Sequence, residues 1–214
     1  MLIIGAIIIG AVGYVSFLLF DFKRGISTTK SVVSKDSDSL IGQVEKVELS
    51  PWPIDDIDLL SRIGQSDLAK KLFGDIESGV LFSIYHEPIL AFASKKYNLD
   101  NTRALALRFN SVVYSIMPIS TGAFEVTKAG DKFAEIVEED LSINTPLNHI
   151  KINKQDGRSL IPVTFNDKIK LMINDQEVDD SDQTRALVSK EPLSEVEGEL
   201  FIIILAFGLI NQII

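Results

Sequence analysis

The feature that most limits how this chain can fold is an uninterrupted apolar segment close to its N-terminus. Residues 2–20 read LIIGAIIIGAVGYVSFLLF, nineteen residues whose only ionisable side chain is the phenol of Tyr14. A bilayer core is about 30 Å thick, and a helix that rises 1.5 Å per residue needs roughly 20 apolar residues to cross it. The segment therefore predicts a transmembrane anchor over residues 1–22.

A cleaved signal peptide is the alternative interpretation of this segment. Such a peptide has a basic start, a shorter apolar core and a cleavage site of small residues. No base precedes the apolar run here, and the residues that follow it are DFKRG. We therefore expect an anchor that stays on the protein.

Basic residues on the C-terminal side of the anchor predict its orientation. They are Lys23, Arg24, Lys30 and Lys35. Because the side of a membrane span that is richer in lysine and arginine tends to stay in the cytoplasm, we expect the main domain there.

Small residues within the span predict a helix–helix contact. Ala6, Gly10 and Gly13 share one helical face, where another helix can approach closely, although glycine is also common in membrane helices generally.

A second apolar segment, residues 200–214, reads LFIIILAFGLINQII. As a helix it is about 22 Å long, which is short for a full span. It has no polar face, so a helix on the protein surface is not expected. A short second span, an element buried against partner subunits and an ordinary core element remain as interpretations. We expect membrane or partner burial, in a protein that crosses the membrane once or twice, through the contact residues Leu200, Phe201, Ile204, Phe207 and Ile210.

The residues between the two apolar segments predict one α+β domain. Ser, Thr, Lys and Asp dominate residues 23–49, which we interpret as a linker. The domain covers residues 50–175, and an acidic loop covers 176–199. Apolar spacing predicts helices first and a small antiparallel sheet after them. The expected helices are 54–73, 78–97, 100–117 and 128–141, and the expected strands are 122–127, 149–153, 160–165 and 168–173.

Charge and motifs point away from several functions. The net charge of −9 argues against a nucleic-acid partner, because phosphate contacts come from clustered lysine and arginine. The chain has no cysteine, and its two histidines, His86 and His149, lack the spacing of a metal site. No phosphate-binding glycine motif and no nucleophile-elbow motif is present. We expect no cofactor, no metal and no catalytic residues, and the acidic loop leaves binding of a divalent cation open.

One short segment has a family resemblance. Residues 124–130 (FEVTKAG), followed by Phe133, Ala134 and Glu135, resemble the strand and helix of winged-helix domains. The resemblance implies a recognition helix over residues 102–117. That segment offers only Arg103 and Arg108 as bases, so the resemblance implies protein contacts rather than DNA contacts.

These observations predict a non-enzymatic protein. We expect a membrane-anchored structural or adaptor subunit of a larger assembly, such as a secretion, motility, respiratory or virion membrane complex. Its expected partners are the lipid bilayer and other protein subunits, with further copies of the chain itself as one option. A membrane-bound regulator with a winged-helix-like domain and a membrane hydrolase with an unrecognised site are the alternatives.

Overall fold

The computed structural model describes most of the chain after the predicted anchor. The described residues are 35–61, 70–72 (backbone only), 76–97, 103–154, 159–174, 186–211 and 213. The predicted anchor, its contact residues Ala6, Gly10 and Gly13, and the first part of the linker lie outside them. In the described part of the chain, no helix has both the length and the apolar character needed to cross a membrane. The chain divides into two compact units, Met1–Asp36 and Ser37–Ile214, and nearly all described residues belong to the second.

The second unit is built on one 12-stranded sheet whose strands follow one another in sequence order. Every neighbouring pair is antiparallel. The strands are β1 (Lys70–Leu72), β2 (Ile76–Phe82), β3 (Pro88–Lys96), β4 (Arg103–Phe109), β5 (Val112–Ser120), β6 (Ala123–Lys128), β7 (Asp131–Val137), β8 (Ser142–Asn144), β9 (His149–Ile152), β10 (Leu160–Phe165), β11 (Lys168–Asn174) and β12 (Leu187–Ser189). The fold is thus α+β, as expected, but the antiparallel sheet dominates it.

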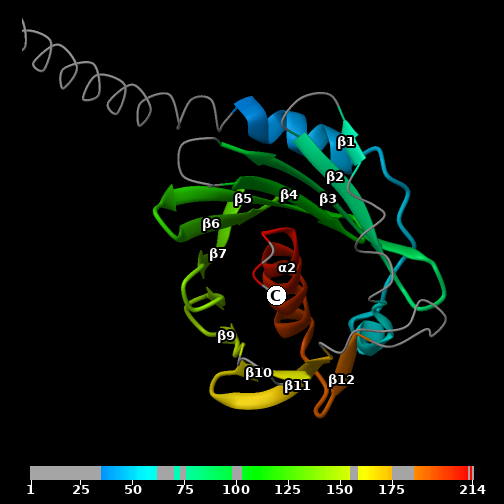
Figure 1. Ribbon diagram of the computed structural model, residues 1–214, viewed down its shortest axis with the longest axis vertical. Helices are drawn as coiled ribbons and strands as arrows, with labels where there is room; N and C mark the ends of the chain where they lie inside the picture. The colour runs from blue at the N-terminus through cyan, green and yellow to red at the C-terminus, as the bar shows by residue number, and fades with distance from the viewer. Residues whose placement is uncertain are drawn as a thin grey trace, which may run out of the picture. The chain divides into compact units, whose positions relative to one another are not determined.

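Helices cover both faces of this sheet. The sheet curls around α2 (Glu195–Ile210), which lies along its concave side (Figure 1). Residues 35–44 form a helix whose Leu40 and Val44 pack on the convex side. A short 3₁₀ helix, η1 (Ile54–Leu59), lies between the end of β2 and the start of β12.

The central strands β3 and β4 explain why the expected helices 78–97 and 100–117 are wrong. Leu90, Leu105 and Leu107 face the core around α2, whereas their alternating neighbours face the helix 35–44. Those neighbours are Ala91, Ala93, Ala104 and Ala106, which are fully buried. A strand that is buried on both faces loses its polar alternation, and its continuous apolar run cannot be told from a buried helix by period.

A two-residue turn overturns the helix expected over 128–141. Ala129 and Gly130 both have positive φ, 51° and 93°, as the central residues of a type I′ hairpin turn require. The turn joins β6 to β7, so the chain reverses where the helix was expected. The resemblance to winged-helix domains fails for the same reason: its strand and helix form this hairpin, and the implied recognition helix forms β4 and β5.

The expected strands are confirmed. Residues 122–127, 149–153, 160–165 and 168–173 correspond to β6, β9, β10 and β11 within one or two residues. Asn166 and Asp167, with φ of 47° and 67°, form a second turn with positive φ at both central positions. The expected helix 54–73 is only partly helical, because η1 ends at Leu59 and the backbone becomes extended at Leu60.

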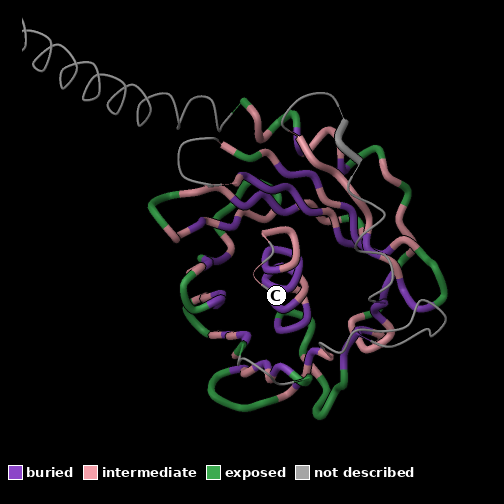
Figure 2. Tube along the Cα trace, in the orientation of Figure 1, coloured by how far each residue is buried: buried purple, intermediate pink, exposed green. Residues whose placement is uncertain are grey.

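The C-terminal apolar segment forms the core of the domain. Leu200, Phe201, Ile204 and Phe207 are each at most 1% exposed, and Ile210 is half-buried. Most of α2 and large parts of the strands around it are coloured as buried in Figure 2. The expectation that a membrane or a partner covers these residues is therefore corrected: the chain's own sheet covers them, because its concave face supplies the apolar surroundings that a helix without a polar face requires.

Two helical glycines allow a test of how closely α2 is packed. A Cβ atom added to Gly198 would lie 2.4 Å from Cγ2 of Ile54, whereas one added to Gly42 meets no atom within 4 Å. We expect Gly198→Ala to lower the free energy of unfolding by about 1–3 kcal/mol through overpacking. Gly42→Ala should leave it unchanged or raise it by up to about 1 kcal/mol, since alanine is the better helix former.

Urea unfolding of the two variants measures both effects. In an Ile54→Ala background the Gly198→Ala change should cost much less, because the clashing side chain is gone. An equal cost in both backgrounds would show that Ile54 is not the obstacle.

Candidate functional site

The concave side of a curved sheet is the natural place for a ligand, and in this chain α2 occupies it. Aromatic rings from the helix and from opposite strands fill the space. The ring centres of Phe207 and Phe124 lie 4.8 Å apart in an edge-on arrangement, and those of Phe201 and Phe165 lie 6.2 Å apart. The domain's own side chains thus fill its interior around Phe201 and around Phe207.

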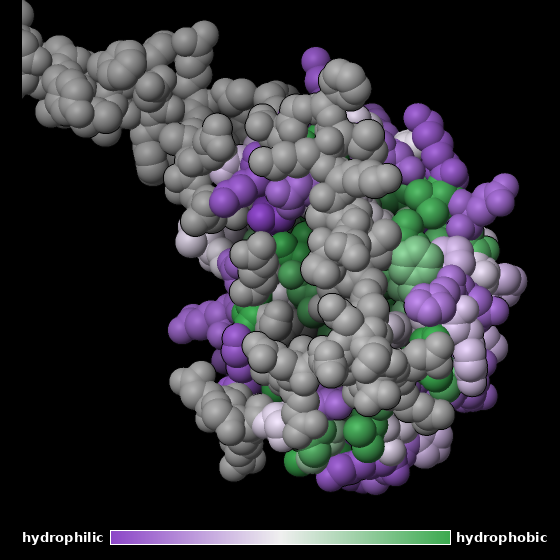
Figure 3. All heavy atoms as spheres, turned by 45° about the vertical axis from the view of Figure 1, so that its right-hand side comes forward, coloured by the Kyte–Doolittle hydropathy of each residue, from purple (hydrophilic) through white to green (hydrophobic). Residues whose placement is uncertain are grey.

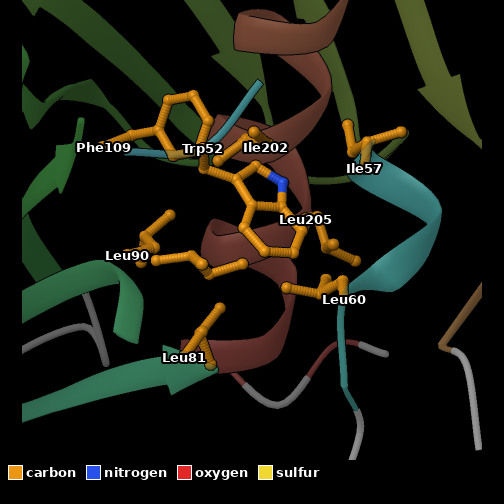
Figure 4. Close-up of a pocket in the computed structure, with 9 residues that line it drawn as sticks. Trp52, Ile57, Leu60, Leu81, Leu90, Phe109, Ile202 and Leu205 are labelled. Carbon is orange, nitrogen blue, oxygen red and sulfur yellow. The ribbon is translucent and has the colours of Figure 1, made fainter. Parts of the chain in front are cut away.

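The described residues leave a small gap where η1 meets the sheet and α2 (Figure 4). Its lining is apolar: Trp52, Ile57, Leu60, Leu81, Ile89, Leu90, Phe109, Ile202 and Leu205. Its volume of about 10 Å³ is near the minimum for one water molecule, which also needs two or more polar partners. The gap is too small and too apolar to hold a polar ligand.

Two lysine–glutamate pairs hold the N-terminal end of α2. Lys170 Nζ from β11 lies 2.8 Å from one carboxylate oxygen of Glu197 and 3.0 Å from the other. Lys128 Nζ from β6 lies 2.9 and 2.7 Å from the oxygens of Glu199. Because each pair joins a different strand to the helix, together they hold its first turns between β6 and β11.

Ser194 completes the arrangement around Glu197. The Ser194 side chain accepts a hydrogen bond from the backbone N–H of Glu197, and the Glu197 carboxylate accepts one from the backbone N–H of Ser194. This reciprocal capping box satisfies two backbone donors at the helix start. Burial acts to raise the pKa of Glu197, but the hydrogen bonds from Lys170 and Ser194 outweigh it, so the pKa is lowered from its ordinary value.

Tyr114 lies beside the second lysine–glutamate pair. It is only 1% exposed, and its hydroxyl has no hydrogen-bond partner among the described residues. Burial, and secondly the negative charge of Glu199, raise the pKa of Tyr114 above its ordinary value. The ammonium of Lys128 lies 5.9 Å from the Tyr114 ring centre and 5.3 Å from that of Phe133. The phenol stays protonated at neutral pH, and the Lys128–Glu199 pair beside it joins β6 to the helix.

The structure separates the residues that sequence reasoning considered for chemistry. His86 lies in the turn after β2 with φ of 61°, while His149 begins β9 and its Nδ1 is hydrogen-bonded to Asn144 Oδ1. No group of three His, Cys, Asp or Glu side chains in the described ranges could hold a metal ion. Residues 176–185 of the acidic loop lie outside those ranges, and the rest of it contains β12 and the first residues of α2.

Sequence reasoning missed the residues that hold α2. The pattern Ser194-x-x-Glu197 directly before an apolar run is a capping-box signal, so the sequence alone could have predicted the start of the helix. Lys128 and Lys170 carry no such signal, because they come from strands far from the helix in sequence.

A band of apolar side chains lies on the convex side of the last three strands. Pro162, Met172 and Val188 are paired directly across β10, β11 and β12, and they alternate with inward-facing residues. Leu160 and Ile169 flank this row on the same side. The exposed fractions are 47% for Val188, 41% for Leu160 and 42% for Ile169. We call these five residues the C-terminal face.

Comparison with known proteins yields no relative: no protein-family model, no curated protein and no solved structure matches the chain.

The pKa of Glu197 predicts a pH dependence of stability. Because the folded pKa lies below the ordinary value of 4.5, the pair with Lys170 stabilises the fold above that value and this contribution is lost as the pH falls through the folded pKa. Glu197→Gln should lower the melting temperature at pH 7, and its difference from the wild type should shrink below about pH 5.

Thermal unfolding followed by circular dichroism from pH 7 to pH 3 measures this difference. Glu195→Gln, which changes an exposed glutamate in the same turn, is the control and should show a small difference at all pH values. A constant deficit for Glu197→Gln across the range would show that the loss comes from packing and not from the charge.

The unpartnered hydroxyl of Tyr114 predicts that the phenylalanine variant is as stable as the wild type. Tyr114→Phe removes a buried polar group that makes no hydrogen bond, so the free energy of unfolding should be unchanged or rise by up to about 1 kcal/mol. Ser94→Ala, at a second buried hydroxyl that bonds to none of the described residues, should behave in the same way. Urea titration is the measurement, and a loss above about 1 kcal/mol for Tyr114→Phe would reveal a hydrogen bond to Glu199.

Proposed function

We propose that this chain is a membrane-anchored, non-enzymatic structural or adaptor subunit of a larger membrane-associated assembly. The apolar segment 2–20 serves as the anchor in this proposal, with Ala6, Gly10 and Gly13 as a helix–helix contact. The folded domain is held at the membrane by residues 23–49 and lies on the cytoplasmic side. Secretion, motility, respiratory and virion membrane complexes are assemblies that contain subunits of this kind.

The observation that carries the proposal is the use of the concave side of the sheet. A curved sheet of this size could enclose a ligand, but the whole length of α2 lies there, with Leu200, Ile204 and Phe207 at most 1% exposed. What the domain offers to other molecules is therefore its outer surface. Contact through surfaces, without a reaction centre, is the property of a structural or adaptor subunit.

The C-terminal face is the part of that surface where we place a partner subunit. Three of its residues, Leu160, Ile169 and Val188, are more than 40% exposed although they lie within or beside regular strands. Contiguous exposed apolar side chains mark protein contacts more often than isolated ones do. On the convex side of β3 and β4, the outward-facing residues are smaller alanines, and the helix 35–44 already covers them.

The test is purification of the full-length protein in mild detergent, with identification of co-purifying proteins. Removing residues 1–22 should move the protein from carbonate-washed membranes to the soluble fraction. In the full-length chain, the double variant Met172→Glu and Val188→Glu should lose its partners at an unchanged melting temperature. Lys168→Glu, an exposed change on the same strand, is the control and should keep them.

Deletion of residues 200–214 is unsuitable for this experiment, because it removes the core helix and unfolds the domain. A full-length protein that is monomeric and without partners would contradict the proposal. Retention of every partner by the double variant would keep the adaptor function but move the contact away from the C-terminal face.

A further inference from the structure

The ammonium group of Lys128 lies between two aromatic rings and a carboxylate. Lys128 is the last residue of β6 and is paired directly with Tyr114 on β5, so both side chains point to the same side of the sheet. Its Nζ lies 5.9 Å from the centre of the Tyr114 ring and 5.3 Å from that of Phe133 on β7. The carboxylate oxygens of Glu199 on α2 lie 2.9 and 2.7 Å from the same nitrogen. We call Tyr114, Phe133 and Glu199 the ammonium cage.

Three neighbouring strands bring the two rings of the cage together. β5, β6 and β7 follow one another in the sheet (Figure 1). A bulge leaves Phe133 as an extra residue of β7, because Val126 pairs with Ala134 and Thr127 with Lys132. The centres of the Phe133 and Tyr114 rings lie 6.0 Å apart and their planes are tilted by 48°. Since a cation is attracted to an aromatic ring within about 6 Å of its centre, both rings contribute to binding the ammonium.

The cage contains a hydroxyl that the fold leaves without a partner. Tyr114 is 1% exposed, and its hydroxyl makes no hydrogen bond to the described residues. Burial, followed by the charge of Glu199, raises the pKa of Tyr114, which places this hydroxyl near the carboxylate. A primary ammonium has three N–H donors, and the two Glu199 oxygens accept from that of Lys128. The cage therefore suits a primary ammonium better than a quaternary one, which has no N–H to donate.

Lys128 can leave the cage without a change in the sheet. Its side chain is 35% exposed, and it ends β6 directly before the turn of Ala129 and Gly130. The other lysine–glutamate pair is more restricted. The side chain of Lys170 is 18% exposed, and its partner Glu197 also accepts hydrogen bonds from Ser194 at the helix start.

Apolar surface alone does not select a ligand in the way that this cage does. On the side of the domain that carries β2 and η1, apolar surface shows between polar side chains (Figure 3). Such surface is compatible with many kinds of partner, because the hydrophobic effect is not directional. The ammonium cage combines ring faces with a carboxylate, and this combination recognises one chemical group, the organic cation.

We propose that the ammonium cage is a binding site for a small primary alkylammonium ion, and that Lys128 occupies it when no ligand is bound. The ligand's ammonium takes the place of the Lys128 ammonium between the rings and donates to both oxygens of Glu199. Lys128 turns into the solvent, and the charge of Glu199 stays neutralised. This site goes beyond the proposed adaptor function and does not depend on it.

The first experiment empties the cage in the full-length protein, purified in an uncharged detergent. Lys128→Ala removes three carbons and the ammonium, the same atoms that n-propylammonium supplies. We expect this ion to bind the variant with a dissociation constant of about 1–10 mM. At ten times that concentration it should raise the melting temperature by about 3–5 °C over equal sodium chloride. The same concentration of 1-propanol, which lacks the charge, or of tetramethylammonium, which lacks N–H donors, should raise it much less.

Two further changes in the Lys128→Ala background show whether the cage itself binds the ion. Glu199→Gln should abolish the effect of propylammonium, and Phe133→Leu should weaken its binding by about three- to tenfold. Lys170→Ala alone is the matched control. It frees Glu197, which Ser194 still engages and beside which Phe165 is the ring near the removed ammonium, so propylammonium should stabilise it less.

A second experiment follows Lys128 in the wild type by NMR of ¹³C-labelled lysine. Ring currents of Tyr114 and Phe133 should displace the signals of its ε-methylene group, and propylammonium should move these signals to the values of an exposed lysine. The proposal is overturned if propylammonium stabilises Lys128→Ala no more than 1-propanol does. It is equally overturned if the wild-type signals stay unchanged up to about 100 times the dissociation constant of the variant, because Lys128 would then be a permanent part of the fold. If Lys128→Ala does not fold, the wild-type titration decides alone.

Discussion

Burial of the C-terminal helix inside the curved sheet is the interaction on which the rest of the structure depends. A helix that is apolar on all sides needs apolar surroundings on all sides, and a strongly curved sheet needs something to fill its concave face. Each element supplies what the other requires. Full burial of a leucine, isoleucine or phenylalanine side chain contributes about 1.5–3 kcal/mol, and α2 buries six such residues between Leu200 and Phe207.

Polar contacts at the N-terminal end of α2 give this apolar packing a defined position. An apolar helix in an apolar space can slide or rotate at little cost, since dispersion contacts are not directional. Lys170 and Lys128 each bind one glutamate of the first turns, and Ser194 caps the helix. Gly198 lets Ile54 of η1 approach the helix closely. These directional and steric contacts fix where the helix enters the sheet and how it is turned.

The convex side of the sheet is covered in one part and exposed in another. Fully buried alanines on β3 and β4 let the helix 35–44 lie close to the sheet, and Arg108 donates to the backbone oxygens of Glu45 and Val47 just beyond that helix. The linker expected over residues 23–49 is therefore partly structured. On β10–β12 the outward residues are larger and more exposed, which is why we place a partner on the C-terminal face and not over β3 and β4.

Local patterns in the chain were enough to find one of its hairpin turns, four of its strands and its two long apolar segments. Asn166-Asp167 and the alternating residues of β11 indicate a hairpin without knowledge of anything else, because turn geometry and strand alternation depend on neighbours in sequence. The Ser194-x-x-Glu197 pattern marks a helix start in the same way. The net charge and the absence of cysteine likewise follow from the chain alone.

Only the tertiary structure decided which apolar surfaces pack together and which charged side chains form pairs. The same apolar segment at 200–214 would suit a bilayer, a partner or the chain's own sheet, because hydrophobic burial is not specific to its surroundings. The sequences of β3 and β4 resemble those of helices, because both faces of these strands are buried, one by α2 and the other by the helix 35–44. Lys128 and Lys170 become functional parts of the fold only when the sheet curls and brings them to Glu199 and Glu197, a proximity that no local pattern encodes.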